Sequence, residues 1–251
     1  IESAKAAGME TMPFVNQNVE TFKKMCKDLN VNYADFIRTT EKRHADTCVD
    51  LWKKLETKGD IYFGVYSGNY CLSCESFYTE TQAPDNICPA HGKELTKKEE
   101  EGYFFKMGQY QKWIINHIKS NPDFIVPHGS YNEMLSRLEK DDLRDLPISR
   151  PNEGWGIPVP ANSKFVMYTW FDALINYYSA LSESERKYWP ADMHVIGKDI
   201  AWFHTVIWPI MLHAADLPLP KQVYVHGMIM AEDGKKMSKS LGNVVDPFDM
   251  L

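Results

Sequence analysis

Helical and strand-like segments alternate along the chain, and no other feature limits its fold as much. Residues 165–168, 193–196 and 222–226 have the length and apolar content of buried strands, and a helical pattern follows each of the first two. Alternation of this kind is typical of a parallel sheet covered by helices. We therefore predict an α/β fold with a Rossmann-like parallel sheet.

Four residues lie at or just beyond the ends of these predicted strands, namely Trp170, Gly197, Asp199 and His226. In open parallel sheets, ligands bind beyond the carboxyl ends of the strands. The pattern therefore predicts that these residues surround a nucleotide site.

Further helices are predicted from apolar spacing and from end signals. One covers residues 41–58, with Thr39 or Thr40 as its cap, and another covers residues 132–146, just before a proline. A third covers residues 199–215. The first of these has an apolar face formed by Cys48, Leu51, Trp52 and Leu55.

The segment at residues 60–127 differs in character and indicates an insertion, because it has aromatic and turn-forming residues and no long alternating strand. Within it, Cys71 and Cys74 are followed by thirteen residues and then by Cys88 and His91. Two pairs with two-residue spacers can direct four ligands at one tetrahedral ion, which predicts a zinc site. With four protein ligands the zinc would be structural. A chance cluster is the alternative.

Charge and composition exclude several classes of protein. The formal net charge of −6 argues against the broad basic surface of a protein that grips nucleic acid through its phosphates. The sequence has no run of about 20 apolar residues, so we expect a soluble protein rather than a membrane-spanning one. Five cysteines, an odd number, favour metal binding in a reducing compartment over a disulfide framework.

The string Lys236-Met237-Ser238-Lys239-Ser240 follows an Asp-Gly-Lys turn, so two ammonium groups are carried on a loop. Lysines act as point charges towards phosphate, and these two could close over a polyphosphate. A solvated lysine-rich loop is the alternative by composition alone.

This string matches the signature loop of the class I aminoacyl-tRNA synthetases, and the chain resembles the methionyl-tRNA synthetases of that class over most of its length. The matching segments, in that family's order, are Ile148-Ser149-Arg150, Ile157-Pro158-Val159-Pro160, Tyr168-Thr169-Trp170-Phe171-Asp172-Ala173, Gly197-Lys198-Asp199-Ile200, Phe203-His204 and Val225-His226-Gly227. The resemblance implies an enzyme that uses ATP with Mg²⁺ to activate L-methionine as methionyl-adenylate. The methionyl group would then pass to tRNA(Met).

By this resemblance the lysine loop acts on phosphate. Lys236 and Lys239 would neutralise the phosphates of ATP and of the departing pyrophosphate, with Ser238 as a further donor. Arg150 corresponds to an active-site arginine of the family, although a surface ion pair is the default for a lone arginine. These residues are the predicted catalytic group.

The resemblance also implies an ATP site beside the strands. Gly197 would permit close approach of the nucleotide, and Asp199 would accept hydrogen bonds from the ribose. A plain helix cap is the alternative for Asp199. His226 and Ile229 would border the adenine, and Lys239 would reach the phosphates.

Trp170, Ala173, Tyr177 and His204 match the family positions that line the methionine pocket. A polarizable thioether sulfur makes favourable contacts with ring edges. Ordinary core packing is the alternative for Trp170 and Tyr177, and a satisfied core histidine is the alternative for His204.

The resemblance implies a division of the chain into four parts. Residues 1–59 would end the first Rossmann half, 60–128 would form the connective-peptide insertion with its zinc knuckle, 129–226 the second Rossmann half, and 227–251 the lysine loop with the start of a stem-contact region. The family's first signature, His-Ile-Gly-His or a variant, is absent from this sequence. We expect it upstream, in the remainder of the same enzyme, with an anticodon-binding domain downstream. The chain alone should be inactive.

Other functions stay open at this point. The synthetases for isoleucine, valine and leucine share the loop, but the chain has no room for an editing domain, which needs well over about 100 residues. The cysteine enzyme uses an open zinc site, unlike the closed set predicted here. A non-catalytic zinc-ribbon or tRNA scaffold and a nucleotidyltransferase that uses no tRNA are further alternatives.

The single-zinc pattern is compatible with a bacterial or protist cytoplasm and with a mitochondrial matrix.

Overall fold

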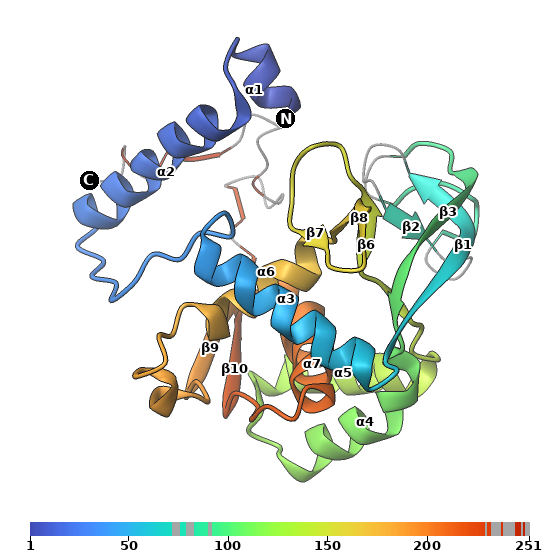
Figure 1. The fold of residues 1–251 in the computed structure, drawn as a ribbon. Helices are drawn as coiled ribbons and strands as arrows, with labels where there is room; N and C mark the ends of the chain where they lie inside the picture. Colours follow the sequence, from blue (N-terminus) through green and yellow to red (C-terminus); the bar gives the residue numbers. More distant parts are fainter. Residues whose placement is uncertain are drawn as a thin grey trace.

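The computed structural model describes residues 1–71, 76–78, 83–89, 92–228, 230–231, 237, 244–246 and 248. The helical elements are α1 (Glu2–Ala6), α2 (Thr11–Asp28), α3 (Lys42–Thr57), η1 (Met107–Tyr110), α4 (Gln111–Ser120), α5 (His128–Lys140), α6 (Thr169–Ser179), η2 (Arg186–Tyr188), η3 (Lys198–Ile200), η4 (Phe203–Ile207) and α7 (Trp208–Ala214) (Figure 1). The strands are β1 (Ile61–Cys71), β2 (Ser76–Tyr78), β3 (Thr96–Phe105), β4 (Ile125–Val126), β5 (Leu146–Pro147), β6 (Ser149–Pro151), β7 (Pro158–Val159), β8 (Asn162–Met167), β9 (Met193–Gly197) and β10 (Gln222–His226). No helix in these described ranges has the length and apolar content needed to cross a membrane.

Three strands form the parallel sheet, in the order β4-β10-β9. Figure 1 shows β9 and β10 side by side. The two strands predicted at residues 193–196 and 222–226 are thereby confirmed as neighbours. Their register pairs Gly197 with His226, so the carboxyl ends of β9 and β10 meet. This edge is where the predicted nucleotide residues should gather.

The third predicted strand, at residues 165–168, does not join the parallel sheet, so that part of the prediction is wrong. It belongs to β8, which pairs antiparallel with β6 on one side and β7 on the other. The Met167 amide donates to the Ile157 carbonyl oxygen, and the Asn152 amide donates to the Lys164 carbonyl oxygen. Both edges of β8 are therefore occupied.

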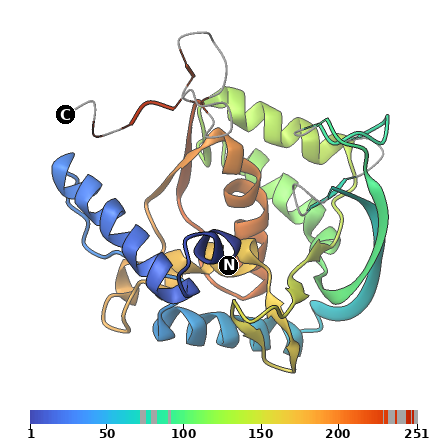
Figure 2. The same ribbon diagram turned by 90° about the horizontal axis from the view of Figure 1, so that it is seen from above.

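Strands β1 and β3 form a long antiparallel hairpin, so the expectation of no long strand within residues 60–127 is wrong. The register runs from Ile61 opposite Phe105 to Tyr70 opposite Thr96. Residues 96–101 are polar and mostly exposed, so they lack the alternating apolar pattern that predicts a strand. The hairpin lies on the opposite side of the molecule from β9 (Figures 1 and 2).

Helix α3 confirms the helix predicted over residues 41–58, and its predicted apolar face is buried. Trp52 on this face packs edge-on against Phe171 of α6 and against Tyr103 of β3, with ring centroids 5.5 and 5.4 Å away. One side chain of α3 therefore contacts both the helix that follows β8 and the long hairpin.

Two predicted helix ends differ in the structure. Helix α3 begins after Glu41 and has no side-chain cap, so neither predicted threonine caps it. Helix α5 ends at Lys140, earlier than predicted. There the Gln111 side-chain amide donates to the carbonyl oxygens of Leu138 and Asp141. A side chain of α4 thus provides hydrogen-bond donors for the last carbonyl groups of α5. A local sequence pattern cannot reveal this contact, because the two helices are separate in the chain.

The helix predicted over residues 199–215 is divided into the 3-10 turn η3, the π-helical turn η4 and α7. Pro209, near the start of α7, has no amide hydrogen, and its ring would clash with a carbonyl group one turn earlier. The wider π-helical turn relieves that clash. Such turns are frequent at functional sites, which draws attention to His204 in η4.

Polar groups are buried where α3 packs on α6. His44 Nδ1 lies 2.8 Å from Ser179 Oγ, and His44 Nε2 lies 3.3 Å from Cys48 Sγ. Asp172 of α6 is 8% exposed, and burial raises the pKa of its carboxyl from 3.8 to about 7. Burial lowers the pKa of His44.

Replacing Asp172 with Asn should stabilise the protein more at pH 8 than at pH 5. A carboxyl whose pKa is raised by folding stabilises the folded state below its unfolded pKa. This contribution falls as pH rises towards the folded pKa, by about 1.4 kcal/mol for each pH unit between the two values. His44 titrates with the opposite sign, so the quantity to measure is the difference in free energy of unfolding between variant and wild type, by urea unfolding.

Asp46→Asn is the control, because Asp46 lies on the outer surface of α3 with its side chain 58% exposed. Only Asp172→Asn should show a gain that grows with pH. An equal effect of Asp172→Asn at both pH values would contradict the burial of this carboxyl.

Candidate active site

Three of the four residues predicted to surround a nucleotide, Gly197, Asp199 and His226, meet where β9 and β10 end. Trp170 does not join them at a strand end of the parallel sheet, because it lies in α6, after the antiparallel β8. A Cβ atom at Gly197 would lie 2.7 Å from the Asp199 carboxylate and 3.5 Å from the His226 ring, so a side chain at this position would displace the Asp199 carboxylate. We refer to Gly197, Asp199 and His226 as the strand-end cluster.

Asp199 of the strand-end cluster lies in η3, directly after β9. Its side chain is exposed and η3 has no side-chain cap, so the plain helix cap considered as the alternative is not observed. His226 is oriented by a 2.8 Å hydrogen bond from its Nδ1–H to the Gly227 carbonyl oxygen. An exposed carboxylate beside a glycine can accept hydrogen bonds from the hydroxyl groups of a ligand.

Helix α6 and turn η4 bring the predicted pocket residues together. Trp170 stacks on Phe203, with ring centroids 4.0 Å apart and planes 17° from parallel. Ala173 and Tyr177 follow Trp170 on one face of α6, at helical spacing. Phe203 was not among the predicted pocket residues, although its place beside His204 in a matching segment was a signal for it. We call these five residues the aromatic pocket.

Tyr177 and His204 form a hydrogen-bonded pair with Oη and Nε2 2.9 Å apart. His204 is 2% exposed, and burial lowers its pKa, so its ring is neutral. Its Nδ1–H donates to the Ile200 carbonyl oxygen at 3.0 Å, which leaves Nε2 to accept from the Tyr177 hydroxyl. His204 is thus a satisfied buried histidine whose partner is a residue of the aromatic pocket.

A second buried histidine, His194 of β9, lies behind this pair. Its ring centroid is 4.2 Å from that of Tyr177, and its Nε2 accepts a 3.2 Å hydrogen bond from the Trp208 indole. Burial, followed by the nearby His204, lowers the pKa of His194 to about 4. The sequence analysis missed His194, although its position on the inward face of a predicted strand was a signal.

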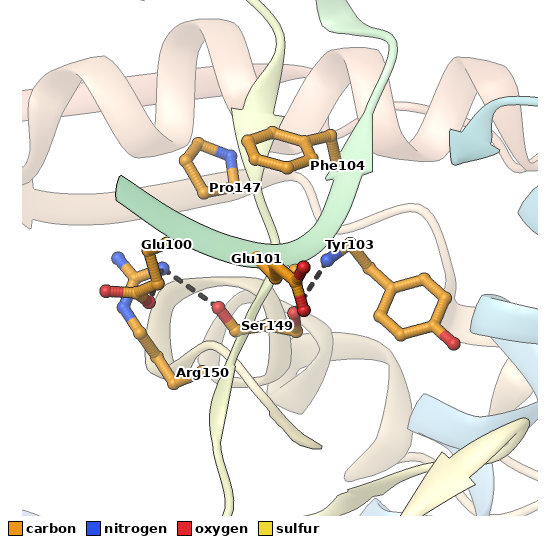
Figure 3. A pocket seen from close by; sticks show the side chains of 8 residues that line it. Glu100, Glu101, Tyr103, Phe104, Pro147, Ser149 and Arg150 are labelled. Atoms are coloured by element: carbon orange, nitrogen blue, oxygen red, sulfur yellow. Dashed lines mark hydrogen bonds and ion pairs between the residues drawn. The ribbon is translucent and has the colours of Figure 1, made fainter. Parts of the chain in front are cut away.

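Arg150 lies on β6, which belongs to a different sheet from β9 and β10. Figure 3 shows its side chain close to those of Glu100 and Ser149. Its guanidinium carbon is 4.4 Å from the centre of the Tyr168 ring, and Nη1 donates to the Ser149 carbonyl oxygen at 2.9 Å. Glu100 of β3 lies 4.0 Å from Nη1, so an ion pair is also present. Because Tyr168 immediately precedes α6, these contacts place Arg150 at the start of the helix that carries most of the aromatic pocket.

Of the predicted zinc ligands, Cys71 and Cys88 are buried in the same small apolar cluster, at 1% and 0% exposure. The Cys88 carbonyl oxygen accepts a 2.8 Å hydrogen bond from the Gly92 amide. Cys74 and His91 lie outside the described residues. Within the described residues, no three potential metal ligands lie together, and the zinc site stays a prediction.

The lysine loop lies largely beyond the part of the chain that the structure describes. This applies to Lys236, Ser238 and Lys239, and also to Ile229. Since β10 ends at His226, the loop follows in sequence the strand that contributes to the strand-end cluster.

A hollow of about 440 Å³ lies elsewhere, between α2 and Phe248. Its other lining residues are Glu20, Thr21 and Lys24. None of these matches a predicted site residue, so we place the candidate site at the strand-end cluster and the aromatic pocket.

Solved structures share this fold. The Mycobacterium tuberculosis methionyl-tRNA synthetase in complex with methionyl-adenylate matches with a TM-score of 0.89 and 40% sequence identity, over 99% of this chain and 50% of that chain. The apo form of the same enzyme matches with a TM-score of 0.77 and 38% identity, over 88% of this chain and 47% of that chain.

Sequence relatives point to the same family. The methionine–tRNA ligase of Clostridium acetobutylicum is 48% identical over 254 residues, and that of Halalkalibacterium halodurans is 43% identical over 267 residues. These matches cover 99% and 100% of this chain but 39% and 40% of the relatives, so the chain spans about two fifths of their length. The family model for tRNA synthetases class I (M) matches residues 1–99 and 80–251. The chain therefore belongs to the class I tRNA synthetases (M), the family of the methionyl-tRNA synthetases.

Proposed function

We propose that the complete protein is a methionine–tRNA ligase, which activates L-methionine with ATP and transfers it to tRNA(Met). The observation that carries the proposal is that the aromatic pocket contacts the turn that carries Asp199. The His204 Nδ1–H donates to the carbonyl oxygen of Ile200, the residue that follows Asp199 in η3. The M. tuberculosis structure, which contains methionyl-adenylate, supports it by similarity of fold.

The aromatic pocket is suited to an uncharged thioether. Burial keeps His194 and His204 neutral. The stacked rings of Trp170 and Phe203 are only partly buried, which leaves ring surface for a ligand. Contacts between sulfur and aromatic rings contribute about 0.3–1.5 kcal/mol each. A charged side chain would lose its hydration among these neutral groups without gaining a counter-charge from them.

The strand-end cluster is suited to the nucleotide. Gly197 leaves room for the ribose, Asp199 would accept hydrogen bonds from its hydroxyls, and His226 with Ile229 would border the adenine. The lysine loop would neutralise the phosphates of ATP, which enters with Mg²⁺, through Lys236, Ser238 and Lys239.

In the proposed reaction the methionine carboxylate attacks the α-phosphate of ATP and pyrophosphate leaves. The methionyl group then passes from the adenylate to a ribose hydroxyl of tRNA. Positioning and charge stabilisation lower the barriers of both steps. In this reaction Arg150 would stabilise the negative charge on the reacting phosphate. The other contacts to ATP, methionine and tRNA would come from the rest of the complete protein, which would include the first Rossmann half and an anticodon-binding domain.

We further propose that residues 60–128 form a connective-peptide insertion whose zinc is held by Cys71, Cys74, Cys88 and His91. Support comes from the burial of Cys71 and Cys88 in one cluster and from the thiolate and imidazole chemistry of the four ligands. When bound, the ion would cross-link the two ligand-bearing turns and stabilise the insertion.

Replacing Lys239 with Ala should slow methionine-dependent ATP–pyrophosphate exchange about 100-fold or more, because a donor aimed at developing phosphate charge is lost. Lys221→Ala is the control, since Lys221 precedes β10 and pairs with exposed Asp192 at 2.6 Å. Normal exchange by Lys239→Ala would remove this lysine from the mechanism. Absence of methionine-dependent exchange in the wild-type protein would refute the proposed function.

Replacing Tyr177 with Phe should raise KM for methionine about tenfold, because His204 loses its buried hydrogen-bond donor and the pocket loses its fixed geometry. The effect is measured by steady-state exchange kinetics. Tyr178→Phe is the matched control, because the Tyr178 ring packs edge-on against Trp189 and this contact does not use its hydroxyl. Equal KM values for the two variants would argue against Tyr177 as a pocket residue.

Metal analysis of the purified protein should find about one zinc per chain, and chelation should lower its melting temperature, because structural zinc contributes folding free energy. Cys88→Ser should lose the zinc. Cys26→Ser, on α2 and outside the ligand set, should retain it. Zinc-free protein whose melting is unaffected by chelation would contradict the knuckle.

A further inference from the structure

Glu100 on β3 forms ion pairs with two cations, Lys98 and Arg150. Figure 3 shows its side chain beside that of Arg150. Oε2 lies 3.0 Å from the Lys98 ammonium, and Oε1 lies 4.0 Å from Nη1 of Arg150. The Glu100 side chain is 12% exposed and that of Arg150 is 26% exposed, so solvent screens their attraction only in part. The adjacent Glu99 and Glu101 on the same strand are exposed.

The Arg150 guanidinium is held by three groups. The Tyr168 ring lies beneath it, the Ser149 carbonyl oxygen accepts one N–H, and the Glu100 carboxylate attracts it. At 4.0 Å the carboxylate makes no hydrogen bond to Nη1, so it holds the charge without occupying that donor. Donor groups of Arg150 can therefore still bind a ligand oxygen.

We propose that Glu100 is a positioning residue for Arg150. Its carboxylate keeps the guanidinium over Tyr168, at the start of α6, where it can meet phosphate charge on a ligand bound beside the aromatic pocket. This inference rests on the proposed function, in which Arg150 acts on the reacting phosphate. Because Glu100 belongs to the long hairpin, the insertion would contribute to the geometry of the site.

The backbone joins β3 to β6 without help from Glu100. The Tyr103 amide donates to Ser149 Oγ at 2.8 Å, and the Ile148 amide donates to the Tyr103 carbonyl oxygen at 2.9 Å. The small hollow lined by these segments has a volume of about 10 Å³ (Figure 3). Neutralising Glu100 should therefore leave the strand contacts intact, and a kinetic effect can be attributed to Arg150.

The test compares variants of the complete protein in methionine-dependent ATP–pyrophosphate exchange. Glu100→Gln should lower kcat about tenfold, with KM for methionine and ATP within about twofold, because misplacing a group that acts in the transition state costs rate rather than ground-state binding. Glu100→Asp keeps the charge and should recover part of the rate. Glu99→Gln removes an equal charge one residue away and should behave as wild type.

A double-mutant cycle separates positioning from a general structural role. If Glu100 acts through Arg150, Glu100→Gln should cause no further loss of kcat in the Arg150→Ala background. A full tenfold loss in that background overturns the proposal, and so does equal kcat for Glu100→Gln and Glu99→Gln.

Crystal structures of the complete wild-type and Glu100→Gln proteins test the position directly. In the variant the guanidinium should leave the Tyr168 ring, and an unchanged position overturns the proposal. This readout does not require catalysis. If the wild-type protein fails to catalyse exchange, the proposed function is wrong, and the two structures still decide whether Glu100 positions Arg150.

Discussion

Packing around Trp52 determines how the main parts of the described structure fit together. Its side chain is fully buried and packs edge-on against Phe171 of α6 and Tyr103 of β3. A buried ring of this size removes roughly 150–250 Å² from water, worth about 5 kcal/mol. Its indole N–H has no hydrogen-bond partner among the described residues, a cost of about 1–3 kcal/mol. The packing gain exceeds that cost, so α3, the pocket helix and the long hairpin share one core.

Burial in the core also determines the charge of two histidines at the candidate site. His194 and His204 lose hydration in the core, which lowers both pKa values and makes them neutral partners of Trp208 and Tyr177. The strand-end cluster, by contrast, lies at the exposed end of the sheet, where Asp199 is accessible. The proposed methionine pocket is therefore uncharged, whereas the proposed nucleotide site is polar.

The proposed insertion and the candidate site are in contact. Strand β3 belongs to the hairpin that leads towards Cys71, yet it is bonded to β6 through Tyr103 and Ser149, and it brings Glu100 to Arg150. An insertion attached only by flexible linkers could not position a charge at this distance. Here ten cross-strand pairs join β1 to β3 and make this part of the chain stiff. The position of Glu100 on β3 can therefore determine the position of Arg150 at the start of α6.

Local sequence was enough to predict α3, β9, β10 and the meeting of Gly197 with His226, because apolar periodicity and strand-end glycines depend on neighbouring residues. Motif spacing alone also indicates the lysine loop and the cysteine pairs. Only the tertiary structure decided that β8 is antiparallel, that Gln111 ends α5, that His194 backs Tyr177 and that Glu100 reaches Arg150. These features are contacts between groups far apart in the chain, often polar ones. Such contacts leave no periodic pattern in the sequence, since their partners become neighbours only when the core forms.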